Sequence, residues 1–161
     1  MYVLGVLFLR EKSCKEIYND PTSGTIAMGS LYTSGFVLGL FEAYCTTVNT
    51  WGGLKEQFSI IKAMAKSPLL SFLAGFLGVI IFWAFFTLLG VIACRKRHNA
   101  ISRIAAVTAC ATLPLSITLL FPILNYFGIK FIFGVDLGWL ITLVAFVWSV
   151  IVEVRAIAAI L

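Results

Sequence analysis

Long uncharged apolar stretches alternate with short polar segments along this chain. Residues 68–94 and 104–129 contain no charged side chain. An α-helix rises about 1.5 Å per residue, so about 20 apolar residues are needed to cross a hydrocarbon core of about 30 Å. Both stretches exceed that length, and each predicts a membrane-spanning helix.

Two further stretches contain few charges. Residues 25–48 include Glu42, and residues 137–158 include Glu153 and Arg155. Inside lipid the backbone must satisfy its own hydrogen bonds, which favours helices over irregular chain. We therefore predict an all-α fold, a polytopic transmembrane helical bundle with about four spans.

Two other segments have the pattern of amphipathic helices. Residues 51–66 place apolar side chains on one side of a helix and lysines on another, which is typical of helices that lie among lipid headgroups. The alternative is that this helix packs on the protein's own spans. The N-terminal segment, residues 1–24, precedes the transmembrane domain of residues 25–161. We expect its helix to rest on the membrane surface as a second interfacial helix.

Composition also indicates lipid as the solvent. Of the 161 residues, 61% are hydrophobic and 12% are charged, whereas soluble domains average about 45–50% apolar and about 25% charged. The net charge of +5 comes from basic residues between the apolar stretches. We therefore assign them to a lipid bilayer or a partner, not to nucleic acid. The predicted headgroup or partner contacts are Lys55, Lys62, Lys66, Arg95, Lys96, Arg97 and Arg103.

The basic residues also predict an orientation. Arg10, Lys12 and Lys15 precede the first span, and the densest basic cluster, residues 95–103, lies between the second and third spans. With four spans these two groups share a side, and Lys and Arg accumulate on the cytoplasmic side of membranes. We expect an integral protein of the cell membrane with a cytoplasmic N-terminus; an ER or Golgi membrane is the alternative.

Residues typical of catalysis are scarce. The one histidine, His98, lies in a basic run, where we expect it to be solvated. The chain has no His-x-x-x-His or Glu-x-x-His motif and no Gly-rich phosphate loop. Its four cysteines are far apart, so they predict neither a metal knuckle nor a disulfide framework. We therefore predict a non-enzymatic protein without catalytic residues, metal or cofactor.

Glu42 and Glu153 are carboxylates within predicted spans. A charge at the bilayer centre costs roughly 2.5–3.5 kcal/mol or more, so both residues are candidates for an ion or proton path. Both also lie toward a span end, where interfacial water or snorkelling relieves that cost. The alternative is therefore an interfacial location, or pairing of Glu153 with a basic residue of a neighbouring loop.

Two prolines, Pro114 and Pro122, lie within the third stretch. Each removes a backbone donor and bends a helix. Thr112, Ser116 and Thr118 are nearby donors for the carbonyls left without a partner. The stretch is either one kinked span or a partly re-entrant one, and a proline-broken helix can build a transport site.

Small residues spaced four apart predict close helix packing. The spacing does not distinguish packing within the chain from packing against a partner or a second copy. The predicted packing residues are Gly35, Gly39, Ser71, Gly75, Ala105 and Ala109.

Three segments occur in an order that is known from one family. Residues 7–17 contain Phe8 and Ser13 at two positions of that family's opening helix motif. Residues 111–114 and the pair Trp148-Ser149 follow in later spans. Together they resemble prokaryotic-type Yip-domain proteins, relatives of the Ypt/Rab-interacting membrane proteins, although that family usually has five spans and this chain offers four. The resemblance implies a polytopic protein of trafficking or membrane-organising type without catalytic residues.

Two functional hypotheses follow. The first is a Yip-like membrane scaffold or accessory subunit, with a membrane-protein partner or a homo-oligomer. The second is a small transporter or channel component that uses Glu42, Glu153 and the proline-broken third span.

Overall fold

The chain is described by a computed structural model that covers residues 5, 11–47, 67–93, 101–129, 131–132 and 135–161. Within these ranges the chain is almost entirely helical, with one short pair of strands. In chain order the elements are α2 (Glu11–Asn19), α3 (Ser23–Thr47), α5 (Pro68–Ala93), α6 (Ile101–Ala111), the 3₁₀ helix η2 (Leu113–Leu119), α7 (Leu120–Tyr126), β1 (Phe131–Ile132), β2 (Val135–Asp136) and α8 (Leu137–Ile160).

Four helical segments are long and apolar enough to cross a membrane. They are α3, α5, the combined α6–η2–α7 segment Ile101–Tyr126, and α8. The predicted all-α bundle with four spans is confirmed, and the chain is an integral membrane protein. The one addition is the antiparallel pair β1–β2, which joins the third span to α8.

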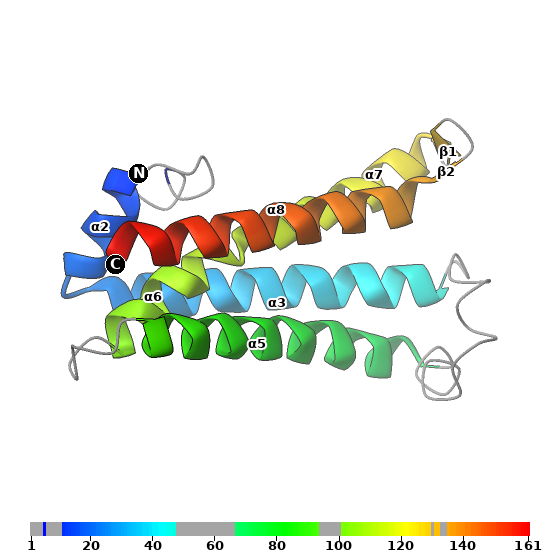
Figure 1. The fold of residues 1–161 in the computed structure, drawn as a ribbon. Helices are drawn as coiled ribbons and strands as arrows, with labels where there is room; N and C mark the ends of the chain where they lie inside the picture. The colour runs from blue at the N-terminus through cyan, green and yellow to red at the C-terminus, as the bar shows by residue number, and fades with distance from the viewer. Residues whose placement is uncertain (1–4, 6–10, 48–66, 94–100, 130, 133–134) are drawn as a thin grey trace.

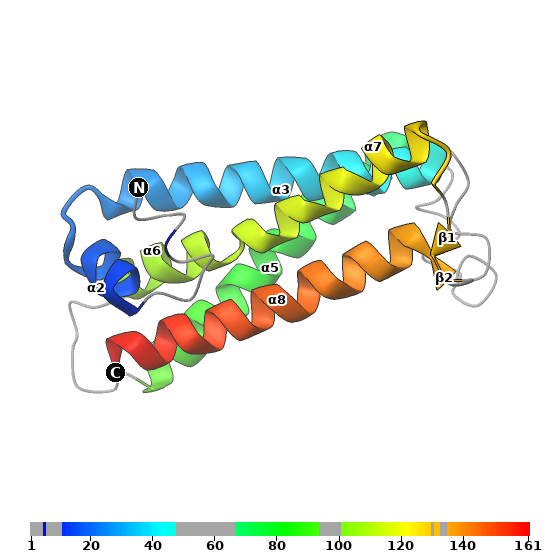
Figure 2. The same ribbon diagram turned by 90° about the horizontal axis from the view of Figure 1, so that it is seen from above.

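The spans run up and down, so both ends of the described chain lie at the same end of the bundle (Figure 1). We call it the α2 end, because α2 lies across it. Figure 2 shows that α5 crosses diagonally beneath the other spans. It packs along α3, and near the middle of both helices Phe82 of α5 makes a ring contact with Phe146 of α8 at 5.7 Å. The third span lies between α3 and α8.

Small residues bring α3 and α5 into close contact. A Cβ atom on Gly39 would lie 2.8 Å from the Phe72 carbonyl oxygen, and one on Gly75 would lie 2.9 Å from the Leu38 carbonyl oxygen. Each backbone therefore fills the space that a side chain on the other helix would need. Close backbone approach of this kind is how helices associate in lipid.

Pro114 interrupts the α-helix of the third span, but the chain continues in the same direction and does not form a re-entrant loop. Pro114 lies at the start of η2 and has no N–H, so the Cys110 carbonyl loses its helical donor. The chain continues as a 3₁₀ helix, in which the Leu115 N–H donates to the Thr112 carbonyl at 3.0 Å. It then returns to α-helix as α7 and ends at the far end of the bundle (Figure 1). The third stretch is therefore one kinked span.

The N-terminal helix differs from the interfacial helix that the sequence predicted. In α2 the side chains of Cys14, Ile17 and Tyr18 are 3%, 1% and 8% exposed. They pack against α6 and α8 rather than lying on a membrane surface. The bundle offers α2 its own apolar surface at this end, so the apolar face of α2 turns inward. The second amphipathic segment, residues 51–66, lies outside the described residues.

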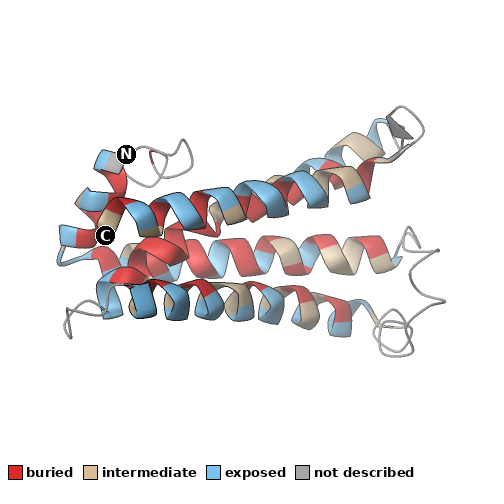
Figure 3. Cartoon of the chain, in the orientation of Figure 1, coloured by how far each residue is buried: buried red, intermediate tan, exposed pale blue. Residues whose placement is uncertain are grey.

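The outer faces of the spans are apolar and exposed. Figure 3 shows this along α5 and α8, where exposed positions face outward along the length of each helix. Ile81 on α5 and Val154 on α8, for example, are 69% and 56% exposed. Side chains of this kind are the lipid-contacting surface of a membrane bundle.

We predict that Gly75→Ala lowers the free energy of unfolding by about 1–3 kcal/mol, because its Cβ would meet the α3 backbone. Gly78→Ala is the matched control on the same helix, since a Cβ there meets nothing within 4 Å. Denaturant titration in mixed micelles, followed by Trp fluorescence, measures both variants. Equal stability of the two variants would contradict the close packing of α3 on α5.

Candidate functional site

Glu153 is buried inside the bundle. It lies on α8, seven residues before the last residue of the helix, and its side chain is 0% exposed. Neither carboxyl oxygen has a hydrogen-bond partner, and no ion pair to Glu153 occurs among the described residues. Glu153 is therefore buried in protein on every side, without a basic partner among the residues that the structure describes. The reason is that α8 turns this position toward α6, η2 and α2.

Ser149 lies one helical turn before Glu153 on the same face of α8. Its side chain is also 0% exposed, and its hydroxyl has no hydrogen-bond partner among the described residues. Ala145 and Ala156 extend this buried face in both directions. These small residues let α8 approach the third span closely, and they leave Glu153 and Ser149 as the polar groups of the buried face.

The break in the third span lies against this part of α8. Cys110 precedes the break, is 0% exposed, and is close enough to Glu153 for an electrostatic interaction between the thiol and the carboxyl group. The carbonyl of Cys110 is the one that Pro114 deprives of its helical donor. On η2, which packs against α8, the Ser116 hydroxyl also has no hydrogen-bond partner in the part of the chain that the structure describes. Buried polar groups without partners therefore gather where the broken span meets α8.

Most other buried hydroxyl groups are paired. Thr112 donates to Ser34 at 3.1 Å, and Thr87 and Thr108 share a hydrogen bond of 2.8 Å between α5 and α6. The Trp83 indole N–H donates to the Ala105 carbonyl at 2.9 Å. Interhelical hydrogen bonds of this kind contribute about 0.6 kcal/mol each in membranes. Against this background Glu153 and Ser149 are exceptions.

Glu42 lies near the opposite end of the bundle. It is five residues before the end of α3 and is half-buried, over Gly75 of α5. Since α3 and α8 run in opposite directions, the structure does not bring Glu42 and Glu153 together (Figure 1). The two carboxylates are separate features.

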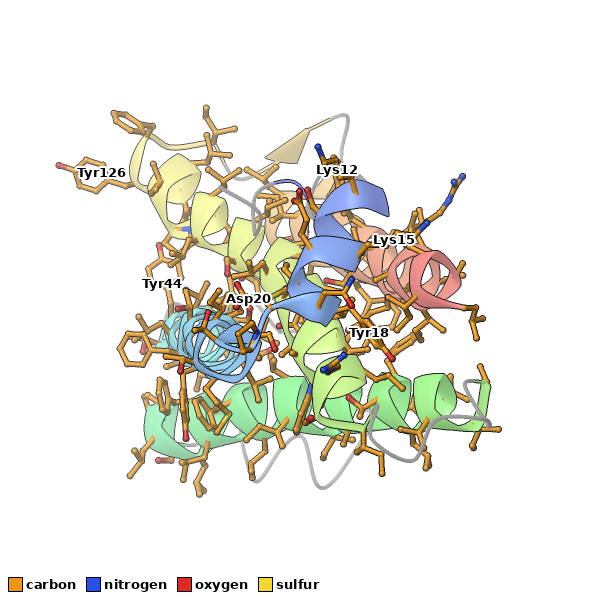
Figure 4. All side chains as sticks on the ribbon, turned by 90° about the vertical axis from the view of Figure 1, so that its left-hand side faces the viewer. Lys12, Lys15, Tyr18, Asp20, Tyr44 and Tyr126 are labelled. Atoms are coloured by element: carbon orange, nitrogen blue, oxygen red, sulfur yellow. The ribbon has the colours of Figure 1, made fainter. Side chains whose placement is uncertain are left out.

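Basic side chains gather at the α2 end. Lys12, Lys15, Arg103 and Arg155 are all exposed there. Arg103, expected in a loop, lies within α6, and its guanidinium carbon is 5.8 Å from the centre of the Tyr18 ring. Figure 4 views this end, with Tyr18 where α2 meets α6.

The turn between α2 and α3 is also fixed at this end. The Asp20 carboxylate accepts hydrogen bonds from the Thr22 hydroxyl and from the Thr22 backbone N–H, both at 2.7 Å. These bonds lower the pKa of Asp20. They hold the chain in the sharp turn that starts α3.

The other predicted residues fall into three groups. Gly35, Gly39, Ser71 and Gly75 lie where α3 meets α5, and Ser71 and Thr46 share a hydrogen bond of 2.7 Å. Ala109 is buried and Ala105 is half-buried on α6, while Pro114 and Pro122 lie in η2 and α7. Outside the described residues lie Lys55, Lys62, Lys66, Arg95, Lys96 and Arg97.

Sequence reasoning did not select Ser149 or Cys110 as site residues. Ser149 has a readable signal, because it stands four residues before Glu153 on one helix face. Cys110 has no such signal, since its relation to Glu153 arises between two different spans.

Comparison with known proteins adds no assignment: no family model, curated protein or solved structure matches this chain. Among the described residues no group of three or more His, Cys, Asp or Glu side chains is placed to hold a metal ion.

We predict that Glu153→Met raises the free energy of unfolding by about 1–3 kcal/mol, because it replaces a buried polar group that has no partner with an apolar chain of similar size. Val154→Met, at the neighbouring lipid-facing position, is the control and leaves stability unchanged. Denaturant titration in micelles measures both. A loss of stability in Glu153→Met would mean that the carboxyl group has a stabilising partner.

Proposed function

We propose that this chain is a non-enzymatic transporter or channel component that carries a cation by way of Glu153. The observation behind this proposal is the Glu153 carboxyl group, which is completely buried and has no partner among the described residues. Structural carboxylates in membrane interiors are paired with a cation or with hydrogen-bond donors. A buried carboxyl group that has neither a paired cation nor a hydrogen-bond donor is suited to bind a cation reversibly.

The energetics support a bound cation. An ionised carboxylate in hydrocarbon costs at least about 2.5–3.5 kcal/mol, and a carboxyl group without hydrogen bonds costs about 1–3 kcal/mol. A cation at Glu153 removes the first cost and part of the second. Binding and release of a cation at Glu153 therefore change the free energy of the bundle by a few kcal/mol.

The break in the third span supplies the second feature. Broken helices in transporters expose backbone carbonyl groups at membrane depth, and these groups coordinate cations. Here the break at Pro114 lies beside the buried face of α8 that carries Glu153 and Ser149. Carboxyl, hydroxyl and carbonyl oxygens are thus available at one depth in the bundle.

Reconstituted vesicles test this proposal. Vesicles containing the protein should conduct protons, Na⁺ or K⁺ faster than protein-free vesicles, as measured with ion-sensitive dyes. Glu153→Gln should reduce the flux to the protein-free level, because the amide cannot bind a cation by charge.

The control is Glu16→Gln on α2, which removes a carboxylate outside the spans and should keep full flux. Wild-type flux equal to that of protein-free vesicles would refute transport, and an unchanged flux in Glu153→Gln would refute the role of Glu153.

A Yip-like scaffold or accessory subunit is the second candidate. It is favoured by the exposed basic residues at the α2 end, where Lys12, Lys15, Arg103 and Arg155 offer a positively charged surface for anionic headgroups or an acidic partner. The resemblance to Yip-domain proteins points to the same role. In this function the chain acts by binding a membrane surface or a protein partner, and Glu153 takes no part in it.

Co-purification in mild detergent tests the scaffold function. We expect a stoichiometric membrane-protein partner or a homo-oligomer with the wild type, and its loss in the double variant Lys12→Glu, Lys15→Glu. Purification of the wild type as a monomer without a partner would contradict the scaffold function and would leave the transport proposal untouched.

A further inference from the structure

We infer that the cation bound at Glu153 is a proton, so that Glu153 alternates between a neutral carboxylic acid and a carboxylate inside the bundle. This inference rests on the proposed function and names its substrate. In the binding step a hydronium ion at the α2 end gives its proton to a carboxylate oxygen of Glu153 and becomes water. In the release step this O–H bond breaks, its electron pair stays on the carboxylate, and the proton passes to a water molecule, which becomes hydronium.

The number of available oxygens favours a proton over a metal ion. Mg²⁺ requires six oxygen ligands and Ca²⁺ six to eight, and channels that strip Na⁺ or K⁺ of water replace it with rings of oxygens. On the buried face of α8 the unpartnered oxygens are the two of Glu153 and the hydroxyl of Ser149. The Cys110 carbonyl and the Ser116 hydroxyl can add two more from the broken span. A proton requires one oxygen.

The surroundings favour the neutral form. The buried side chains on the elements that pack around Glu153 are mostly apolar, and they include Val107, Val152, Ala156 and Ala159. The charged groups at this end, Lys12, Lys15, Arg103 and Arg155, are exposed. Surroundings of low polarity stabilise a carboxylic acid relative to a carboxylate.

Few titratable groups face Glu153 from the packed elements. From α6 there is the Cys110 thiol, whose sulfur accepts a hydrogen bond from the Ser30 hydroxyl at 3.6 Å. From α2 there are the buried side chains of Cys14 and Tyr18. The described parts of η2, α3, α5 and α8 contribute no further buried titratable group to this end. Glu153 is therefore the one carboxyl group among the buried side chains that the structure describes at this place.

The position of Glu153 also suits a proton. Seven residues separate it from the end of α8, which corresponds to about 10 Å along the helix axis. Over that distance α2 covers the bundle with Cys14, Ile17 and Tyr18. A hydrated metal ion would need α2 to move away, whereas a proton can pass along transient water or hydroxyl groups.

A hydrophobic carbodiimide tests the protonation state directly and without any flux measurement. This reagent adds to a protonated carboxyl group and leaves an adduct with the mass of the whole reagent. With the wild type in micelles we expect one adduct on the peptide that contains Glu153. Its yield should fall about tenfold for each pH unit above the titration midpoint, as a one-proton equilibrium requires, and Na⁺ or K⁺ should not change it.

Two variants complete the design. Glu153→Gln should lose the adduct, and Glu16→Gln should keep it. Protection by Na⁺ or K⁺ at constant pH would identify a metal ion as the ligand and overturn the inference, while Glu153-dependent flux could still stand. The absence of any adduct on Glu153 in the folded protein at acid pH would also overturn it. A pH-dependent adduct without vesicle flux would leave the proton site standing and refute the transport function.

Discussion

Lipid offers no hydrogen-bond partner, and this constraint organises the whole molecule. Each polar group at membrane depth must find its partner within the chain. The spans meet that demand by remaining helical and by pairing their hydroxyl groups, as Thr87 does with Thr108 and Thr112 with Ser34. Close packing follows from the same constraint, since glycines allow α3 and α5 to approach until backbone meets backbone.

The constraint is broken where the third span meets α8. Pro114 removes a donor from the third span, and beside the break α8 carries Glu153 and Ser149 without partners. A folded membrane protein of this size has little stability to spare, so unpaired polar groups are expected to be retained for function rather than for stability. In the proposed transport function, proline, serine and carboxylate belong to one site, since the broken helix packs against the helix that carries the buried acid.

The α2 end adds a second layer to this arrangement. Helix α2 covers the bundle with its apolar face and presents basic residues outward, so one short element both closes the core and shapes the charged surface. Any exchange between Glu153 and water at this end has to pass this cover. The proposed transport and scaffold functions thus involve the two sides of the same helix. Mutations can change the charge on its outer side and the burial on its inner side separately.

The sequence by itself determined the number and approximate limits of the spans, because the length of an uncharged apolar stretch can be compared directly with the thickness of the hydrocarbon core. It also marked Glu153 and Pro114 as unusual. It did not determine that α2 packs inward, that the third span is kinked rather than re-entrant, or that Glu153 lies beside Cys110 and away from Glu42. Those facts depend on which helix faces pack against each other. Only the tertiary structure decides this, because an apolar helix face has about the same free energy in contact with lipid as in contact with another apolar helix.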